Sequence, residues 1–80
     1  MYLEIITPDK KVFEGEVNLV QVPGSKGSFT MLKNHAPIIS TLDKGTIRVV
    51  DVLGKEHLFM VSGGVIENLD NKVIVLVESA

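Results

Sequence analysis

The side chains that could build a hydrolytic site in this sequence are five serines and two histidines. A serine nucleophile needs a histidine as its base and a third group that orients the imidazole. No serine stands in the Gly-x-Ser-x-Gly pattern of a nucleophile elbow. The sequence therefore predicts no catalytic residue and a protein that is not an enzyme. The residues considered are Ser25, Ser28, Ser40, Ser62, Ser79, His35 and His57.

Metal, cofactor and nucleic-acid sites also lack the residues they need. There is no cysteine, and the two histidines are far apart in the sequence without a carboxylate cluster, so we expect no metal site. The loop Pro23–Ser28 is rich in glycine but runs into an apolar segment and does not open a helix, as a phosphate loop would. We therefore expect no cofactor. Eight scattered basic residues and four aromatic ones are too few to bind nucleic acid.

The elements expected to position these residues are short strands. Clusters of Gly, Pro, Asn and Asp recur along the chain at short intervals, and each can reverse its direction. The segments between them are rich in Val, Ile and Phe. We predict one domain, residues 1–80, that is all-β: a small antiparallel β-sandwich of about nine to ten short strands. The expected strands are Leu3–Ile6, Lys11–Phe13, Val17–Val22, Ser28–Met31, Ile38–Leu42, Thr46–Val52, His57–Val61, Val65–Glu67 and Val73–Val77.

Several of these strands are apolar on both faces, although only one face of a strand can point into a single sandwich. In Thr46–Val52 the surplus apolar residues are Val50 and Val52, and in Val73–Val77 they are Ile74 and Leu76. Overlap of the strands at the edges of a small sandwich could bury such residues. Exposure as a docking patch for a partner is the interpretation we favour. The pattern thus indicates a binding module.

Two loops allow more specific expectations. In Asn34-His35-Ala36-Pro37 the proline favours an extended Ala36. His35 then either packs over its own loop and bonds a backbone carbonyl, or belongs to a contact surface. Gly63-Gly64, inside an apolar stretch, predicts a bulge or a close approach of two backbones.

Membrane targeting is also readable from the sequence. The start of the chain has no basic region followed by an apolar one, so we predict no signal peptide. The longest purely apolar run, Val73–Val77, is far short of a membrane span. We expect an intracellular protein without direct membrane insertion, which other proteins would hold if it works at a membrane.

A series of short motifs from Leu3 to Leu76 resembles the epsilon subunit of F-type ATP synthase in order and spacing. The motifs are Thr7-Pro8-Asp9, Val12-Phe13-x-Gly15-x-Val17, Val20-x-Val22-Pro23-Gly24-Ser25-x-Gly27, Asn34-His35-Ala36-Pro37-Ile38-Ile39, Leu42-x-x-Gly45-x-Ile47, Val61-Ser62-Gly63-Gly64-Val65-x-Glu67 and Asn71-x-Val73-x-Val75-Leu76. The resemblance implies a non-catalytic β-sandwich in the central stalk, at the cytoplasmic face of the bacterial inner membrane. It would bind the gamma subunit by one sheet face and meet the c-ring at one end, and so couple ion flow to ATP synthesis.

The resemblance and the surplus apolar faces together predict the site residues. Ser28, Lys33, Asn34 and His35 would face the c-ring, and the surplus apolar residues Val50, Val52, Ile74 and Leu76 would face gamma. The sequence departs from the family at Ser28, where an acidic residue is common, and at Lys33, where a proline is common.

A third departure concerns length. Family members usually continue into a C-terminal helical hairpin that in many bacteria restrains ATP hydrolysis, whereas this sequence stops at Ala80. We therefore expect a subunit that couples rotation without regulating it.

Two other functions fit a small all-β domain. One is a lipoyl or biotinyl carrier, in which a lysine at a hairpin tip, here Lys44, is modified. The other is a sandwich adaptor of a different complex. Neither is supported by the motifs above.

Overall fold

The computed structural model describes residues 1–80, and every regular element in it is a β-strand. No helix is present that could cross a membrane. The strands are β1 (Tyr2–Ile6), β2 (Lys11–Val22), β3 (Phe29–Leu32), β4 (Ile38–Leu42), β5 (Gly45–Asp51), β6 (Glu56–Val61), β7 (Gly64–Leu69) and β8 (Lys72–Val77).

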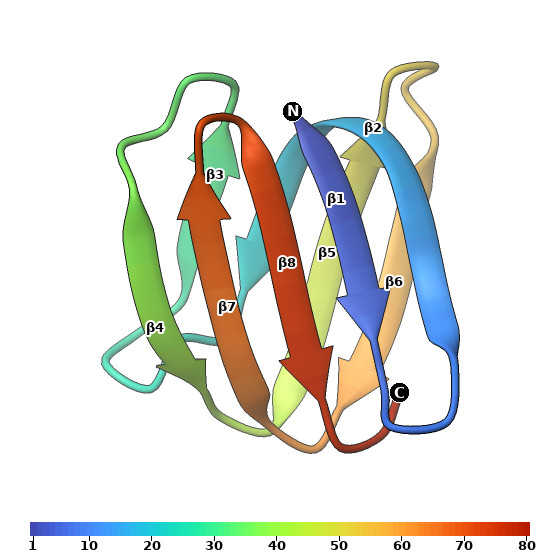
Figure 1. The fold of residues 1–80 in the computed structure, drawn as a ribbon, viewed down its shortest axis with the longest axis vertical. Helices are drawn as coiled ribbons and strands as arrows, with labels where there is room; N and C mark the ends of the chain where they lie inside the picture. Colours follow the sequence, from blue (N-terminus) through green and yellow to red (C-terminus); the bar gives the residue numbers. More distant parts are fainter.

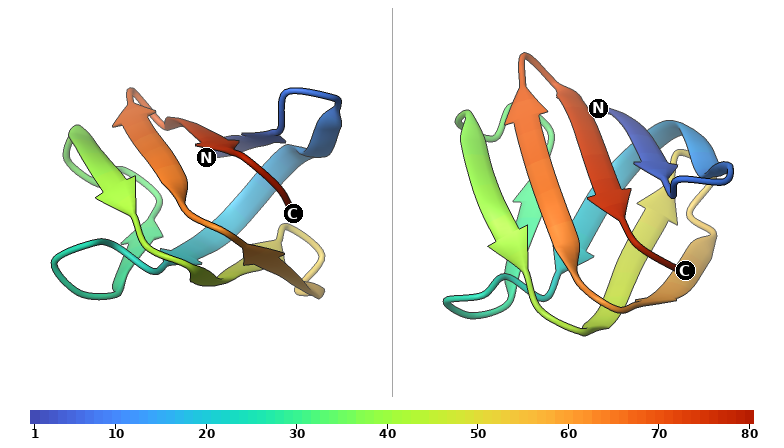
Figure 2. Two further views of the ribbon diagram at one scale, coloured as in Figure 1. Left: turned by 90° about the horizontal axis from the view of Figure 1, so that it is seen from below. Right: turned by 60° about the horizontal axis from the view of Figure 1, so that its bottom comes forward.

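The strands form two layers that share β2 (Figures 1 and 2). The front sheet has the order β4-β7-β8-β1-β2 and uses the first half of β2. The back sheet consists of the second half of β2 with β3 on one side and β5 and β6 on the other. Because β2 passes from one sheet to the other, the layers are joined at one side. At the other side β4 and β3 are the last strands of their sheets.

The all-β sandwich is confirmed, with two differences in detail from the sequence prediction. Eight strands replace the expected nine to ten, because Lys11–Phe13 and Val17–Val22 belong to one twelve-residue strand, β2. The expected break between these two segments, at residues 14–16, is also strand, and Gly15 pairs with Leu3 of β1. The arrangement is also not wholly antiparallel, since β1 and β8 pair in parallel. The sequence indicates where a strand begins and ends but not which strand it pairs with. It therefore could not predict the parallel pairing of β1 and β8.

The core lies between the two layers and is built from alternate residues of each strand. The outward neighbours in the same strands are half-buried or exposed, as the alternation predicts. Aliphatic side chains of moderate size fill the core, while Phe13, Phe29 and Phe59 pack at its margins. The fully enclosed members are Leu3, Ile5, Val17, Val20, Val22, Met31, Ile47, Val49, Ile66, Val73 and Val75.

The predicted close backbone approach at Gly63-Gly64 is confirmed. A Cβ atom on Gly64 would collide with the Leu76 carbonyl oxygen and would lie 2.9 Å from a methyl group of Val77. Gly64 begins β7 and pairs with Val77 of β8. Only glycine allows these two strands to lie this close at the lower end of the front sheet.

Candidate partner-binding surfaces

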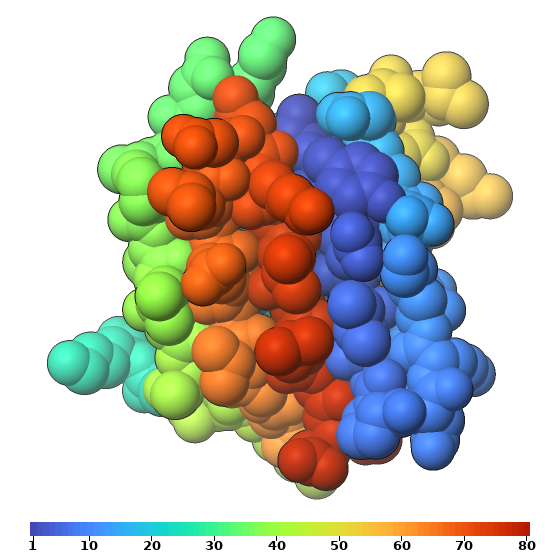
Figure 3. Space-filling view, in the orientation of Figure 1, coloured from blue at the N-terminus to red at the C-terminus, as the bar shows by residue number.

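The front sheet exposes a cluster of apolar side chains on β4, β7 and β8. Val65 pairs with Leu76, and Glu67 lies between its register partners Ile39 and Ile74. Ile39 is 72% exposed and Leu76 is 52% exposed. These five residues line one shallow depression in the surface, on the face that Figure 3 shows. We call them the front apolar surface.

The rest of the front sheet, on β1 and β2, is charged. The ammonium group of Lys11 lies 3.3 Å from a Glu4 carboxylate oxygen and 3.1 Å from one of Glu14. The Tyr2 hydroxyl donates to Glu14, and this hydrogen bond raises the pKa of Tyr2 to about 12. Hydrogen bonds from Tyr2 and Lys11 lower the pKa of Glu14. The front apolar surface therefore has a charged border whose groups are already paired with one another.

The back sheet exposes a second set of apolar side chains, which we call the back surface. Met60 is 77% and Leu58 is 60% exposed. Leu58 pairs with Arg48, whose guanidinium forms an ion pair with Glu56 across the same face. Charged side chains therefore lie among the apolar residues of the back surface rather than to one side of them. Its apolar members are the exposed Leu32, Leu58 and Met60 and the half-buried Leu19 and Val50.

The four residues predicted to face gamma divide between these surfaces. Ile74 and Leu76 lie on the front apolar surface. Val50 belongs to the back sheet, and Val52 lies beyond the end of β5, in the turn to β6. The structure therefore does not bring all four onto one face. The alternation shows which residues are surplus, but it does not show to which sheet their strand belongs.

The turn after β5 is organised by Asp51. One carboxylate oxygen accepts hydrogen bonds from the Leu53 and Lys55 backbone N–H groups, each at 2.9 Å. The other lies 2.9 Å from Nε2 of His57, whose ring packs edge-on against Phe13. The His57 contact, followed by the Lys55 N–H, lowers the pKa of Asp51. The His57 ring therefore has a structural role in this turn.

Ser28 lies in a loop that extends from the lower left of the molecule in Figures 1 and 3. The base of this loop is fixed. Ser25 N–H donates to the Thr41 carbonyl at 3.0 Å, and the Thr41 hydroxyl donates to Ser25 Oγ at 2.9 Å. Gly27 N–H closes the loop on the Gly24 carbonyl. A fixed base presents exposed residues 25–28 to a partner in one arrangement.

Lys33, Asn34 and His35 lie at the opposite end of the sandwich, in the connection from β3 to β4 (Figure 1). Asn34 and Asn71 are joined by two hydrogen bonds, of 2.7 and 2.8 Å. Nδ1 of His35 lies 2.7 Å from the Ala36 carbonyl oxygen. The buried Asn68 amide donates to the carbonyls of His35 and Ala36. Most polar groups of this loop therefore form hydrogen bonds within the domain. The contact of His35 with a backbone carbonyl agrees with the interpretation in which His35 packs over its own loop.

The polar side chains do not assemble a reaction centre. No serine hydroxyl is hydrogen-bonded to a histidine; Ser79 donates to Ser62, and Ser40 to the Thr41 carbonyl. No group of three potential metal ligands lies together. Lys44 lies in the connection from β4 to β5, which belong to different sheets, so it is not at a hairpin tip. This placement does not match the carrier alternative.

Ile39 and Val65 of the front apolar surface were not among the predicted site residues. Both lie in strands that alternate, with buried Leu42 and buried Ile66 pointing inward. A stricter application of the same alternation to β4 and β7 would have identified them.

Comparison with known proteins agrees with this fold. The family model described as the ATP synthase delta/epsilon chain β-sandwich domain matches residues 1–80. The ATP synthase epsilon chain of Desulforapulum autotrophicum is 41% identical over 80 residues, which cover all of this chain and 59% of that protein. The epsilon chain of Nitratidesulfovibrio vulgaris strain Miyazaki F is 46% identical with the same coverage. The chain therefore spans a little over half the length of these curated relatives.

Solved structures show the same fold. A chain in the Euglena gracilis mitochondrial ATP synthase structure, which holds OSCP, F1 and the c-ring, superposes with a TM-score of 0.89 at 22% identity. That match covers 96% of this chain and 49% of the other. A chain in the Tetrahymena thermophila ATP synthase central stalk and c-ring structure gives a TM-score of 0.77 at 19% identity, covering 96% and 62%. By the match of the family model over its whole length and by these identities, the chain belongs to the ATP synthase delta/epsilon chain β-sandwich family.

Proposed function

We propose that this chain is a non-catalytic central-stalk subunit of an F-type ATP synthase that binds the gamma subunit and contacts the c-ring. In this role it couples ion flow to ATP synthesis at the cytoplasmic face of a bacterial inner membrane. The observation that carries the proposal is the front apolar surface, a contiguous cluster of three exposed and one half-buried apolar side chain in a member of the epsilon-chain family. The chain spans 59% of the length of these relatives, and the proposal concerns this β-sandwich domain.

The gamma subunit is assigned to the front apolar surface. Four apolar side chains there meet around one carboxylate, Glu67, with the charged border beside them. An apolar centre with a polar rim is the usual anatomy of a protein–protein interface. This assignment retains Ile74 and Leu76 from the sequence prediction and leaves Val50 and Val52 outside the contact.

The c-ring contact is assigned to the loop around Ser28. This loop is anchored on β4 at Thr41, so it adjoins the front apolar surface through the strand that carries Ile39. The loop of Lys33, Asn34 and His35 is separated from it by the four residues of β3, a length of about 13 Å at the usual rise of a strand. The two loops therefore do not face one flat ring surface together, and we assign the ring contact to the protruding loop around Ser28.

Thermal melts with and without the cognate gamma subunit test the first assignment. A partner that binds only the folded state stabilises it by RT ln(1 + [L]/Kd), which is about 2.7 kcal/mol at a hundredfold excess over Kd. We expect the midpoint to rise as gamma is added up to saturation. An unchanged midpoint with saturating gamma contradicts the proposal.

Cross-linking in the reconstituted synthase tests the second assignment. Ser28→Cys is expected to form a disulfide with single cysteines placed in the polar loops of the c-ring, and the matched variant His35→Cys is expected not to. Both positions are at least partly exposed in this chain, so access to the oxidant is comparable. The reverse pattern would move the ring contact to the opposite end of the sandwich.

A further inference from the structure

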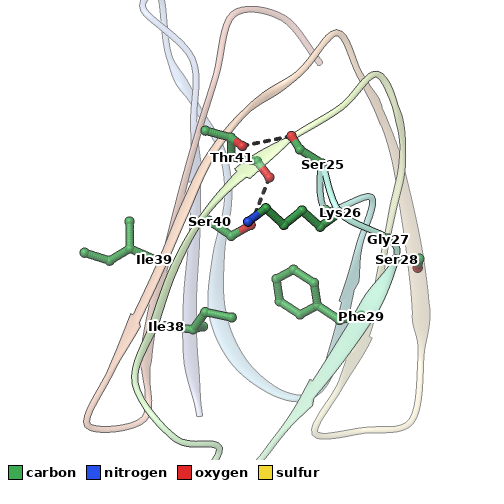
Figure 4. A pocket seen from close by; sticks show the side chains of 10 residues that line it. Ser25, Lys26, Gly27, Ser28, Phe29, Ile38, Ile39, Ser40 and Thr41 are labelled. Atoms are coloured by element: carbon green, nitrogen blue, oxygen red, sulfur yellow. Dashed lines mark hydrogen bonds between the residues drawn. The ribbon is translucent and has the colours of Figure 1, made fainter.

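The side of the sandwich where β3 and β4 end the two sheets has an opening that no strand fills. A cavity of about 610 Å³ lies there, between residues 24–29 and residues 38–41. Phe29 and Ile38 face it from opposite sides, and the Lys26 side chain extends across it from the loop (Figure 4). The opening thus has an apolar floor and one positive charge at its rim.

The lower part of the β4 edge is already covered by an extended segment of the chain itself. Gly24 forms an isolated antiparallel bridge with Leu42. Ser25 N–H donates to the Thr41 carbonyl at 3.0 Å, and Asp43 N–H donates to the Pro23 carbonyl at 2.8 Å. The structure therefore shows what kind of group covers this edge: an extended polypeptide paired through its backbone.

The upper part of the same edge is uncovered. In a strand, the N–H and C=O of one residue point to the same side, and alternate residues share that side. Since the Thr41 carbonyl points away from β7, the N–H of Thr41 and both backbone groups of Ile39 also point away from it. No hydrogen bond outside the strand pairs reaches them. A β-bulge is one of the features that protect edge strands from pairing with another chain. β4 has no bulge in its register, so this protection is absent.

We propose that the β4 edge at Ile39 and Thr41 receives an extended segment of the gamma subunit as an added strand, an inference that rests on the proposed function. The gamma subunit is the occupant because Ile39 belongs to both this edge and the front apolar surface, so one partner can cover both. Backbone pairing at an exposed edge is a known mode of peptide recognition. A segment with a carboxylate beside Lys26 fits the charge at the rim.

Amide hydrogen exchange, followed by NMR on the labelled chain with unlabelled cognate gamma subunit, tests this directly. We expect the exchange of the Ile39 and Thr41 amides to slow by more than tenfold in the complex. Amides of β6, the edge strand of the back sheet, serve as the matched control and should not change. If the complex forms while both amides exchange as in the free chain, strand addition is wrong and the proposed function remains. If no complex forms, the proposed function fails and this inference fails with it.

A pair of variants separates the backbone from the side chain. Ile39→Pro removes the outward N–H, and proline is tolerated where an edge N–H faces solvent. Ile39→Ala shortens the side chain but keeps the N–H. We expect gamma binding to weaken at least about fivefold more in the proline variant, the effect of one lost hydrogen bond. Thermal melts of both free variants establish that they fold. Equal weakening in two folded variants would overturn the proposal.

Discussion

The two outer faces of the sandwich both expose large apolar side chains, but they distribute charge differently. On the front apolar surface, Ile39, Val65, Ile74 and Leu76 surround a single carboxylate, and the paired charges of β1 and β2 lie to one side. On the back surface, the Arg48–Glu56 ion pair lies beside Leu58 within the apolar set. Removing water from the front therefore desolvates one carboxylate at its centre, Glu67, which a cationic group of the partner has to pair. Removing water from the back surface desolvates the Arg48–Glu56 ion pair, which costs free energy.

The number of exposed apolar residues on a face therefore does not by itself locate an interface. Exposed apolar residues are common on soluble proteins, and a contiguous patch is the informative feature. The front set is contiguous because Val65 and Leu76 are register partners on β7 and β8, and Ile39 and Ile74 flank Glu67 in the next row on the same face.

The largest expected effect comes from placing a charge at the centre of each surface in turn. Leu76→Asp on the front and Leu58→Asp on the back are matched, since these leucines are 52% and 60% exposed. We expect Leu76→Asp to weaken gamma binding by more than about 2 kcal/mol, as at a hot spot. Leu58→Asp should change it by less than about 0.5 kcal/mol. Titration calorimetry with purified gamma measures both.

Each charge variant needs a stability control. Both leucines point outward, so each variant should keep its free energy of unfolding within about 0.5 kcal/mol of the parent. Urea unfolding measures this. Loss of gamma binding by Leu58→Asp alone would show that the interface lies on the back sheet.

A smaller effect on binding, with a clear effect on folding, is expected from Gly64→Ala. The added Cβ collides with the Leu76 carbonyl, so β7 and β8 must separate where the front apolar surface is formed. We expect a loss of about 1–3 kcal/mol in the free energy of unfolding, as for overpacked sites. Val65→Ala, one residue further along β7 and exposed, should cost less than about 1 kcal/mol. Equal free energies of unfolding for the two variants, measured in urea, would show that β7 and β8 can move apart without loss of stability.

The sequence predicted much of this architecture because the local signals were strong. Alternation assigned Ile47 and Val49, and Val73, Val75 and Val77, to inner faces, and all five are buried. Turn residues correctly marked most strand ends, such as Asn34 with its left-handed backbone, at a φ of 65°. The break expected at Gly15 was wrong because glycine also occurs inside strands; here Gly15 pairs with Leu3 of β1.

What the sequence could not supply was pairing at long range. Ser28 and His35 are seven residues apart, yet β3 lies between them and places them at opposite ends of the sandwich. Val50 and Leu76 have the same surplus character in their strands but belong to different sheets. Which strands become neighbours depends on contacts between distant segments, and periodicity within one strand carries no information about them.

The smallest expected effect concerns the turn that borders the back surface, and it depends on pH. The pKa of Asp51 is lowered in the folded chain, chiefly by its hydrogen bond with His57. The unfolded chain therefore binds this proton more readily than the folded chain does. The stability that Asp51 contributes is present above its usual pKa of 3.8 and is lost as the pH falls through the lower folded value.

Asp51→Asn removes this contribution while keeping an oxygen that can accept from Leu53 and Lys55. We expect a lower melting midpoint than that of the parent at pH 7, and a difference that narrows below about pH 4 as the parent loses the same interaction. Asp43→Asn is the matched control, because Asp43 is exposed in the connection from β4 to β5, and the midpoint of this variant should follow that of the parent throughout. Because the turn lies away from the front apolar surface, gamma binding at pH 7 should be unchanged in Asp51→Asn. A midpoint difference that stays constant down to pH 2 would show that the Asp51 carboxylate acts through its shape rather than its charge. Weaker gamma binding by Asp51→Asn would show that this turn contributes to the interface.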